Sequence, residues 1–476
     1  MFPELIKLRN ELSQSNNHET SFLRGCIADI VRDKADRNLL NISLNAGVLQ
    51  ELFQEATHDT FFIRRCKNKL IEEFFITESA AEMAVDYCLF LARKIEIKLI
   101  PYRKGDKWGF CNADKEIVVD CIYDDALPFT EGVAVVLLNE KFGCIDKNGI
   151  NITPFIYDYI YTGFCEGLAA VSIDEKWGFI DLHGKALVPC IFDKVDDEFH
   201  NGFAGVAIDD KWGFVDKNGN MIGSSNYHSV KPFSEGMAAV SIDKKWGFID
   251  ESGNQITPII YDEVESFSEG LAACMISKKA GFIDKNGEIV IPFNYSQAHS
   301  FSEGLAAVST ITKSLLDSRR TGYIDKNEMI IIPFIYNDIT DVSQFSEGLA
   351  YVNRGEKWGY IDKTGKIAIP FTFDYNCFAH EFSEGLAWVT MNGKKGLIDK
   401  TGKIIITDTY DFEFPFSEGV ADVQLDRKHG LINKIGKMVV PCKFDGIGRF
   451  SDGLAPVSLD GVKGYVDING VEYWED

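Results

Sequence analysis

A glycine, preceded by tryptophan in several places, recurs at an almost constant interval through most of the chain. The successive spacings are 34, 35, 35, 34, 34, 41, 37, 37, 34 and 34 residues. A fixed period of this size indicates small supersecondary units that must stack on their neighbours to bury a core. The sequence therefore predicts a tandem array of eleven copies. Copies 1 to 11 are numbered by their glycines: Gly109, Gly143, Gly178, Gly213, Gly247, Gly281, Gly322, Gly359, Gly396, Gly430 and Gly464.

Each copy reads as a set of short antiparallel strands. A Phe-Ser-Glu-Gly-Leu-Ala-x-Val segment precedes the Trp-Gly strand, and an Asp-Lys-Asn-Gly turn follows that strand. An apolar run then ends near a proline, as in Trp246 through Pro258. Aspartate accepts hydrogen bonds from turn amides and glycine adopts positive φ at little cost, so both residues favour hairpin turns. We expect about three antiparallel strands of five or six residues in each copy.

Two arrangements of the copies remain open. The first is an all-β open solenoid or superhelix of eleven three-stranded units, which we expect because the period is 34 residues. The alternative is a closed, propeller-like ring, whose blades usually have four strands and around 40 residues and whose rings seldom exceed about eight blades.

The repeat resembles the Trp-Gly (WG, or KWG) repeat family of bacterial proteins. The residues that carry this likeness are Lys107-Trp-Gly-Phe, Lys176-Trp-Gly-Phe-Ile-Asp, Lys211-Trp-Gly-Phe-Val-Asp-Lys-Asn-Gly, Lys245-Trp-Gly-Phe-Ile-Asp and Lys357-Trp-Gly-Tyr-Ile-Asp-Lys-Thr-Gly. The likeness covers about 380 residues and implies a binding scaffold. It brings no catalytic residues.

Residues 1–95 lack the repeat and have apolar residues at helical spacing, which predicts a small all-α bundle ahead of the array at 96–476. One helix is expected across Phe61 to Phe75, and another from Thr77. Asn41 and Ser43 are interpreted as a break before a helix that holds Val48. The segment also resembles a helical module that bacteria append to repeat and signalling proteins, through Leu23-Arg-Gly-Cys-Ile-Ala-Asp-Ile, Ala46-Gly-Val-Leu-Gln-Glu-Leu and Ser79-Ala-Ala-Glu-Met-Ala-Val. That likeness implies an adaptor or docking role, and a cap over the end of the array is the alternative.

Composition restricts the partners. The chain has 49 Lys and Arg against 72 Asp and Glu, a formal net charge of −23. This charge repels nucleic acid and anionic lipid, so we expect neither a nucleic-acid nor a membrane partner. The first residues lack the basic and apolar segments of an export signal, and we expect a cytoplasmic protein with reduced cysteines. The oligomeric state is not predicted.

The tryptophan of the motif varies more than the glycine. Six copies replace it with Phe, Ala, Thr, Lys, His or Lys, whereas the residue after the glycine stays apolar. In one interpretation the tryptophan packs flat over the glycine of a neighbouring strand. In the other, an aromatic ladder binds an extended polymer or peptide. The candidate ladder is Trp108, Trp177, Trp212, Trp246 and Trp358.

The recurring aspartate of the turn suggests two roles, calcium binding and turn capping. The spacing lacks the Gly-Gly-x-Gly-x-Asp pattern of calcium-loaded β-rolls, so capping is the preferred interpretation. The eight histidines are scattered and the sequence has no phosphate-binding loop or nucleophile elbow. We therefore predict no catalytic residues, no metal and no cofactor.

The repeat is least regular between copies 6 and 9. Copy 7 carries seven extra residues around Arg319 and Arg320, and the following loops are also longer. Because insertions on one face of a repeat array often contact partners, this patch is the first candidate for partner binding. The full set of candidate contacts is Arg319, Arg320, Tyr336, Phe373, Tyr375, Trp177, Trp212 and Trp246.

These features predict a non-catalytic scaffold that presents an acidic β-repeat surface to another protein. The helical segment serves as a docking module or a cap. The alternative is a carbohydrate- or polymer-binding protein, or an enzyme, that uses the aromatic and acidic positions of the repeat.

Overall fold

The computed structural model describes residues 27, 34–46, 48, 60–74, 77–78, 80–81, 83–85, 88, 98–161, 163–196, 198–311, 319–374, 380–407 and 410–475. The chain divides into two compact units, Met1–Lys98 and Leu99–Asp476. Each unit is described separately below. The predicted helix around Leu8 and the contact residue Tyr375 lie outside the described residues.

The first unit contains helix α3 (Lys34–Asn45) and helix α5 (Thr60–Phe74). Helix α5 matches the helix predicted from Phe61 onward. The break predicted at Asn41 and Ser43 is wrong, because both residues lie within α3. The Ser43 hydroxyl donates a hydrogen bond to the carbonyl of Leu39 one turn earlier, which satisfies the side chain without ending the helix.

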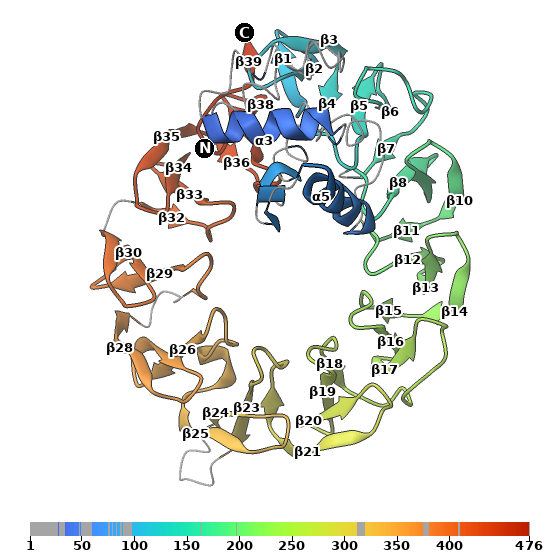
Figure 1. Ribbon diagram of the computed structural model, residues 1–476. Coiled ribbons are helices and arrows are strands. Elements are labelled where there is room, and N and C mark those ends of the chain that lie inside the picture. Colours follow the sequence, from blue (N-terminus) through green and yellow to red (C-terminus); the bar gives the residue numbers. More distant parts are fainter. Residues whose placement is uncertain are drawn as a thin grey trace. The chain divides into compact units, whose positions relative to one another are not determined.

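The second unit is a series of small antiparallel sheets, and copy 6 shows the full pattern. Its strands are β18 (Glu263–Val264), β19 (Leu271–Ile276), β20 (Lys279–Asp284) and β21 (Ile289–Tyr295), paired in that order. In Figure 1 the short first strand lies toward the centre and the last strand lies at the rim. The prediction of three strands missed this two-residue first strand, which carries no pattern of its own in the sequence.

The other copies repeat this order with local losses. Copies 1 to 4 contain β1 (Ile100–Lys104), β2 (Lys107–Cys111), β3 (Ile117–Tyr123), β4 (Asp125–Ala126), β5 (Ala134–Leu138), β6 (Lys141–Ile145), β7 (Tyr159–Ile160), β8 (Leu168–Ile173), β9 (Lys176–Asp181), β10 (Ala186–Phe192), β11 (Lys194–Val195), β12 (Phe203–Ile208), β13 (Lys211–Asp216) and β14 (Met221–Tyr227). Copies 5, 7 and 8 contain β15 (Ser229–Val230), β16 (Met237–Ile242), β17 (Lys245–Asp250), β22 (Gln297–Ala298), β23 (Ala306–Ile311), β24 (Arg319–Ile324), β25 (Ile330–Tyr336), the 3-10 helix η1 (Ile339–Asp341), β26 (Leu349–Arg354), β27 (Lys357–Asp362) and β28 (Ile367–Asp374). Copies 9 to 11 contain β29 (Leu386–Met391), β30 (Lys394–Asp399), β31 (Ile404–Thr407), β32 (Phe412–Glu413), β33 (Val420–Leu425), β34 (Lys428–Asn433), β35 (Met438–Phe444), β36 (Gly446–Ile447), β37 (Leu454–Leu459), β38 (Val462–Asp467) and β39 (Trp474–Glu475).

The glycine of the motif is required by the approach of the outer strand. In copy 6, a Cβ atom on Gly281 would lie 2.6 Å from the carbonyl oxygen of Ile291 and 2.9 Å from the amide nitrogen of Phe293. Both atoms belong to the backbone of β21, which cannot move aside cheaply. This contact explains why the glycine never varies while the tryptophan before it does.

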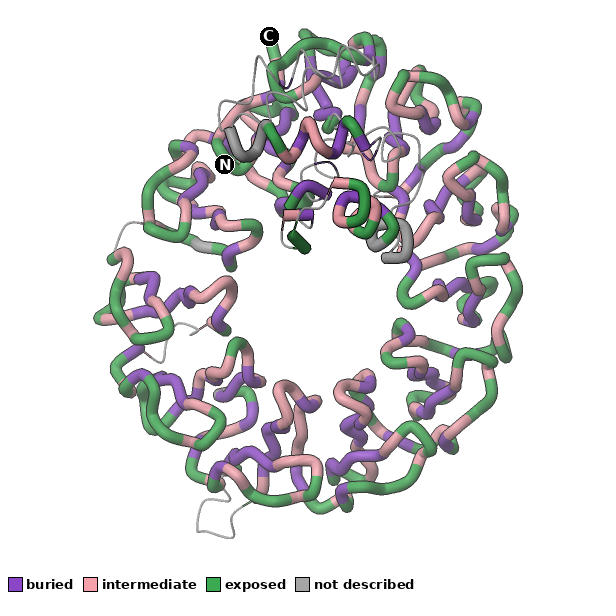
Figure 2. The backbone as a smooth tube through the Cα atoms, in the orientation of Figure 1, coloured by how far each residue is buried: buried purple, intermediate pink, exposed green. Residues whose placement is uncertain are grey.

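The core lies between successive copies. Phe248 and Tyr261 of copy 5 pack against Ala272, Cys274 and Ile283 of copy 6. Figure 2 shows buried residues within and between the sheets and exposed residues along the outer rim. No copy buries its apolar side chains alone, as the period predicts.

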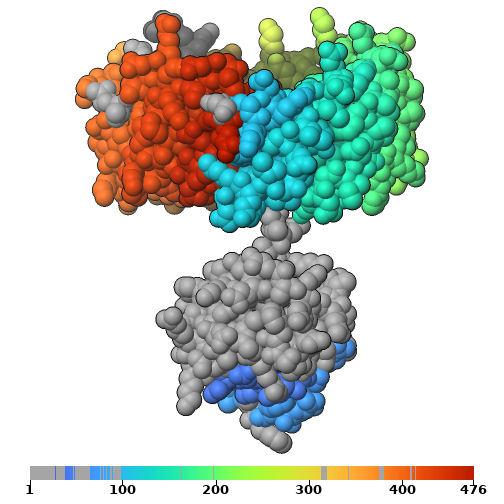
Figure 3. Space-filling view, turned by 90° about the horizontal axis from the view of Figure 1, so that it is seen from above, coloured from blue at the N-terminus to red at the C-terminus, as the bar shows by residue number. Residues whose placement is uncertain are grey.

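The array is a closed ring, so the expected open solenoid is wrong (Figure 1). Strand β39, at the end of the chain, pairs in parallel with β1 and takes the place of the missing inner strand of copy 1. The Gly105 amide donates to the Glu475 carbonyl over 2.9 Å, and Lys463 forms an ion pair with Asp125 at 3.0 Å. In the space-filling view of Figure 3, the first and last copies adjoin.

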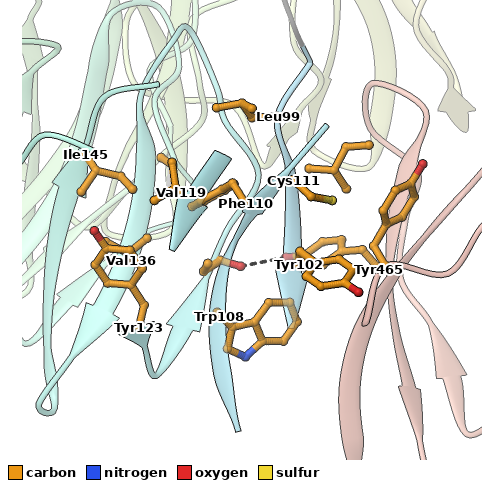
Figure 4. Close-up of a cluster of buried hydrophobic side chains, with 14 of the residues drawn as sticks. Leu99, Tyr102, Trp108, Phe110, Cys111, Val119, Tyr123, Val136, Ile145 and Tyr465 are labelled. Carbon is orange, nitrogen blue, oxygen red and sulfur yellow. Dashed lines mark hydrogen bonds between the residues drawn. The ribbon is translucent and has the colours of Figure 1, made fainter. Parts of the chain in front are cut away.

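A single apolar cluster spans the point of closure. Tyr465 of copy 11 lies against Trp108 of copy 1, with ring centroids 5.8 Å apart. Figure 4 shows Tyr465 beside Tyr102 and Trp108, with its hydroxyl directed to the Ala126 carbonyl at 3.4 Å. The buried Tyr473 completes the cluster. Contacts between the two ends, rather than the period, decide that the array closes.

Candidate functional site

The Phe-Ser-Glu-Gly segment joins each copy to the next. In copies 5 and 6, the Ser234 hydroxyl donates to the Phe267 carbonyl over 2.8 Å, and the Gly270 amide donates to Glu235 over 2.9 Å. We call this pair of contacts the Ser-Glu link. Further serine donors are Ser268, Ser302, Ser346 and Ser383, and further glutamate acceptors are Glu131, Glu166, Glu269, Glu303, Glu347, Glu384 and Glu418.

A lysine of the following copy completes the Ser-Glu link. Lys285, which follows the turn aspartate of copy 6, lies 3.2 Å from Glu235 of copy 5. Partial burial acts to raise the pKa of Glu235, but the Gly270 amide and the Lys285 ammonium hold that pKa below its ordinary value. The glutamate therefore stays ionised at neutral pH. Glutamate and lysine recur at these two positions in most copies of the sequence. Their contact could not be inferred from the sequence, because it forms only when one copy lies against the next.

A second link uses the aspartate after the Ile-Tyr pair. Asp262 of copy 5 forms an ion pair with Lys245 of its own copy, and it accepts the Ser277 amide of copy 6 over 2.7 Å. The hydrogen bond from Lys245 is the main cause of a lowered pKa at Asp262. We call this contact the Asp link. It explains why lysine precedes Trp-Gly, which turn chemistry and strand alternation alone do not require.

The turn aspartates cap their own turns, as predicted. Asp250 accepts the amides of Ser252 and Asn254 over 2.9 and 2.8 Å, and the Asn254 side chain donates to it over 3.0 Å. The Asn254 side chain is the main cause of the lowered pKa of Asp250. Across the described residues, no group of three or more His, Cys, Asp or Glu side chains is placed to hold a metal ion.

The motif tryptophans lie between copies. Trp177, Trp212 and Trp246 are each half-buried in a different apolar cluster, whereas Trp108 and Trp358 are buried. The interpretation in which the tryptophan covers a glycine gains no support: Trp246 lies opposite Ser241 on the neighbouring strand, and the outer segment lies against the motif glycine Gly247. Each tryptophan packs in an apolar cluster at a junction, and its degree of burial differs between copies.

The patch around the longest insertion divides into surface and core. Arg319 forms an ion pair with Asp338 at 3.3 Å, and Arg320 donates to the Asn337 side chain over 3.1 Å. Both arginines lie on β24, at the end next to residues 312–318. That segment, which holds most of the insertion, lies outside the described residues. The surface role of the two arginines remains a prediction.

Tyr336 and Phe373 belong to the core. Their side chains are only 2% and 3% exposed, in two different apolar clusters. Both occupy the repeat position of Tyr261, whose side chain points inward from the outer segment. Their position beside longer loops suggested exposure, but strand alternation decides their burial. We therefore remove them from the candidate contact surface.

One histidine interacts closely with a carboxylate. His429 takes the tryptophan position of copy 10, and its Nδ1 lies 2.9 Å from Asp422 while its Nε2 lies 2.9 Å from the Gln424 amide nitrogen. Burial raises the pKa of Asp422 despite this contact. The three side chains lie within one sheet and substitute for a tryptophan, which is consistent with a packing role.

This geometry defines a circular β-repeat unit whose successive copies are joined by the Ser-Glu and Asp links. The chain belongs to the WG-containing repeat family, whose profile matches ten segments between residues 108 and 462. The family assignment made from the motif is thus confirmed. Comparison with curated proteins finds no match.

Several solved structures are distantly similar. One described as a eukaryotic initiation factor has 12% identity and a TM-score of 0.43, covering 64% of this chain and 93% of its own. AztD from Citrobacter koseri has 13% identity and a TM-score of 0.27, covering 67% and 95%. Hsv2 from Kluyveromyces lactis has 10% identity and a TM-score of 0.28, covering 56% and 94%. Likeness at this level carries no functional conclusion.

No helix among the described residues combines the length and the apolar composition that a membrane span requires.

Proposed function

We propose that the ring is a non-catalytic scaffold that binds another protein. The observation that carries this proposal is the use of the recurring polar side chains. The serine, glutamate, lysine and aspartate of the motif form the Ser-Glu and Asp links, and the turn aspartates cap turns. The recurring polar side chains of the motif therefore have structural roles. A binding surface would be formed by the residues that differ between copies.

The variable residues lie mainly on the hairpin turns before Trp-Gly and on the short inner strands. The turn of copy 3 is Asp174-Glu175, whereas that of copy 5 is Asp243-Lys244. Both pairs have positive φ angles, so the backbone is the same and only the side chains change. A constant frame with variable surface groups is what a binding scaffold needs.

The acidic composition supports a protein partner rather than nucleic acid or an anionic membrane, and a cytoplasmic location remains part of the proposal. The helical unit is proposed as a docking module, with a capping role as the alternative. A carbohydrate- or polymer-binding role remains the second candidate because Trp177, Trp212 and Trp246 keep partly exposed edges.

The test is affinity capture from native lysate with the full-length chain, followed by cross-linking and mass spectrometry. We expect a partner in near-stoichiometric amount that resists moderate salt and cross-links to residues of the ring. The same chain is applied to a glycan array. Specific glycan binding without a stoichiometric protein partner would overturn the proposal in favour of the second candidate.

A further inference from the structure

Four aromatic side chains meet at the junction of copies 2 and 3. Tyr159 lies 5.5 Å from Phe142, 5.5 Å from Tyr161 and 6.0 Å from Trp177, measured between ring centroids. Tyr161 and Trp177 are 5.1 Å apart. Tyr159 is 47% exposed, so this aromatic cluster reaches the surface. Tyr159 and Tyr161 come from β7 and the residue after it, which are not part of the recognisable motif.

Two other junctions show what these aromatic positions accept. In copy 5, Lys231 takes the position of Tyr161, and its ammonium lies 5.7 Å from the centre of the Trp246 ring. The correspondence follows from the backbone, because Tyr161 donates to Ala170 as Lys231 donates to the equivalent Ala239. The same ammonium donates to the Val264 carbonyl over 2.7 Å and lies 3.7 Å from Glu265, so a lysine of the chain lies between the Trp246 ring and these oxygens.

The second example involves the other half of the cluster. Between copies 9 and 10, Lys395 takes the position of Phe142, and its ammonium lies 4.6 Å from the centre of the Phe412 ring. Phe412 takes the position of Tyr159, as the strand registers show. The two positions that hold lysine in copies 5 and 9 hold Tyr161 and Phe142 at the junction of copies 2 and 3.

Carboxylates surround a hollow next to this cluster. The hollow has a volume of about 710 Å³ and is lined by Asp158, Ser172, Asp174, Glu175 and Trp177. Asp158 is neutralised by Lys141 through an Asp link. Asp174 and Glu175 lie on the hairpin turn and form no ion pair within 4 Å among the described residues, although Asp174 contributes to the raised pKa of Lys141 after Asp158. A face of aromatic rings beside two such carboxylates favours a cationic group.

We propose that this hollow binds a lysine or arginine side chain of a partner protein. The inference rests on the proposed scaffold function and names the chemistry of the contact. The aliphatic part of the side chain would pack on Tyr159 and Trp177, and its charged end would face Asp174 and Glu175. The occupant would supply the cation of this junction from the hollow, because Tyr161 and Phe142 fill the places that Lys231 and Lys395 hold at the other two junctions.

The probe is a fluorescein-labelled octapeptide of alternating lysine and alanine, titrated with the full-length chain at low salt and followed by fluorescence anisotropy. The variant Tyr161→Lys introduces the residue that copy 5 already holds at this position, so the fold accommodates it. We expect at least a tenfold weaker affinity, because the new ammonium repels a cationic occupant and the cluster loses one ring. Tyr159→Ser, which copies the Ser229 of copy 5, is expected to weaken binding in the same direction.

The control for charge uses two matched hairpin turns. Glu175→Lys reproduces the turn of copy 5 next to the hollow, and Asp210→Lys makes the same change in net charge at the equivalent position of copy 4. We expect Glu175→Lys to weaken the peptide at least tenfold and Asp210→Lys to change its affinity less than twofold. Equal losses in both variants would overturn the proposal, because they would indicate general attraction to an acidic protein.

Unchanged peptide affinity in Tyr161→Lys, with an unchanged melting temperature, would also overturn the proposal. If the full-length chain then still captures a stoichiometric protein partner, the scaffold function stands and only this site fails. Displacement of the peptide by a neutral oligosaccharide, but not by free arginine, would assign the hollow to a carbohydrate and likewise overturn the inference.

Discussion

The contacts that join copy 5 to copy 6 differ from the contacts that join copy 11 to copy 1. The first junction uses the Ser-Glu and Asp links, in which motif side chains supply the serine donor, the carboxylate acceptors and the lysines, and the Lys231 ammonium adds a hydrogen bond to the Val264 carbonyl. The second uses the parallel pairing of β39 with β1, the backbone carbonyl of Glu475 and the ion pair of Lys463 with Asp125. Copy 1 has no Phe-Ser-Glu-Gly segment to receive the usual link.

The motif therefore supplies the contacts between neighbouring copies, but it does not supply the contacts that join the last copy to the first. An internal junction can be reproduced any number of times, because each copy offers the same donors and acceptors on its two sides. The point of closure occurs once and needs residues outside the motif, notably Tyr473 and Arg103. The buried Arg103 guanidinium donates to the Lys463 carbonyl over 2.9 Å. Perturbing the two kinds of junction separately tests this distinction.

Removal of residues 472–476 should have the largest effect. It deletes β39 and the buried Tyr473, and losing a buried aromatic side chain alone costs about 3–5 kcal/mol. We expect a lower melting temperature and a larger radius of gyration as the two ends separate, measured by calorimetry and small-angle scattering. Glu475→Gln keeps β39 and should leave the radius unchanged. A truncated chain that scatters as a closed ring would contradict the role assigned to β39.

Gly281→Ala should be next in size. Its Cβ would lie 2.6 Å from the Ile291 carbonyl oxygen, and overpacking of this kind costs about 1–3 kcal/mol. Gly446→Ala is the matched control in copy 11, because the nearest atom to its Cβ is the Ser458 hydroxyl at 3.5 Å. Equal urea midpoints for the two variants would show that the outer strand can move away from the motif glycine.

Ser268→Ala removes one hydrogen bond of an internal Ser-Glu link, to the Phe301 carbonyl at 2.8 Å. We expect a loss of about 1 kcal/mol in the free energy of unfolding. Ser451 occupies the same position in copy 11, where the described residues provide no corresponding bond to copy 1. Ser451→Ala should therefore cost less. The reverse order in urea denaturation would mean that the closure also depends on its motif serine.

Glu303→Gln should have the smallest effect, about 0.2–1 kcal/mol, because Glu303 and its partner Lys363 are both partly exposed. Partial burial acts to raise the pKa of Glu303, but Lys363 and the Gly348 amide keep it below 4.5. The ionised carboxylate thus stabilises the fold above pH 4.5, and this contribution is lost as the pH falls through the lower folded pKa. The difference in melting temperature between Glu303→Gln and the natural chain should shrink from pH 7 to pH 3. A difference independent of pH would exclude the charge as its cause.

The motif predicted much of the fold within a copy. The hairpin turns, the capping by Asp250 and the core position of Phe248 follow from turn chemistry and strand alternation, which act over a few residues. The two-residue strand β18 was missed because pairing with β19, not its own sequence, makes it a strand. Tyr336 was misplaced because the length of a nearby loop was given more weight than its position in the repeat.

The candidate site was less predictable. The sequence drew attention to Trp177, but Tyr159 and Tyr161 carry no motif, and only stacking of copies 2 and 3 brings them to Phe142. The preference for a cationic occupant follows from two other junctions, where Lys231 and Lys395 occupy the positions of Tyr161 and Phe142. Such comparisons need the strand registers, because loops of different length obscure the equivalence in the sequence.

The sequence by itself determined that this chain is an array of eleven β-copies, since the period, the turns and the invariant glycine are local requirements that each copy repeats. Only the tertiary structure decided that the array closes. Closure depends on contacts between copy 11 and copy 1, which lie at opposite ends of the array and meet only in the folded chain. Stacking of the copies likewise places Trp177 beside Tyr159 and Glu235 beside Lys285, pairs whose contacts exist only once one copy lies on the next.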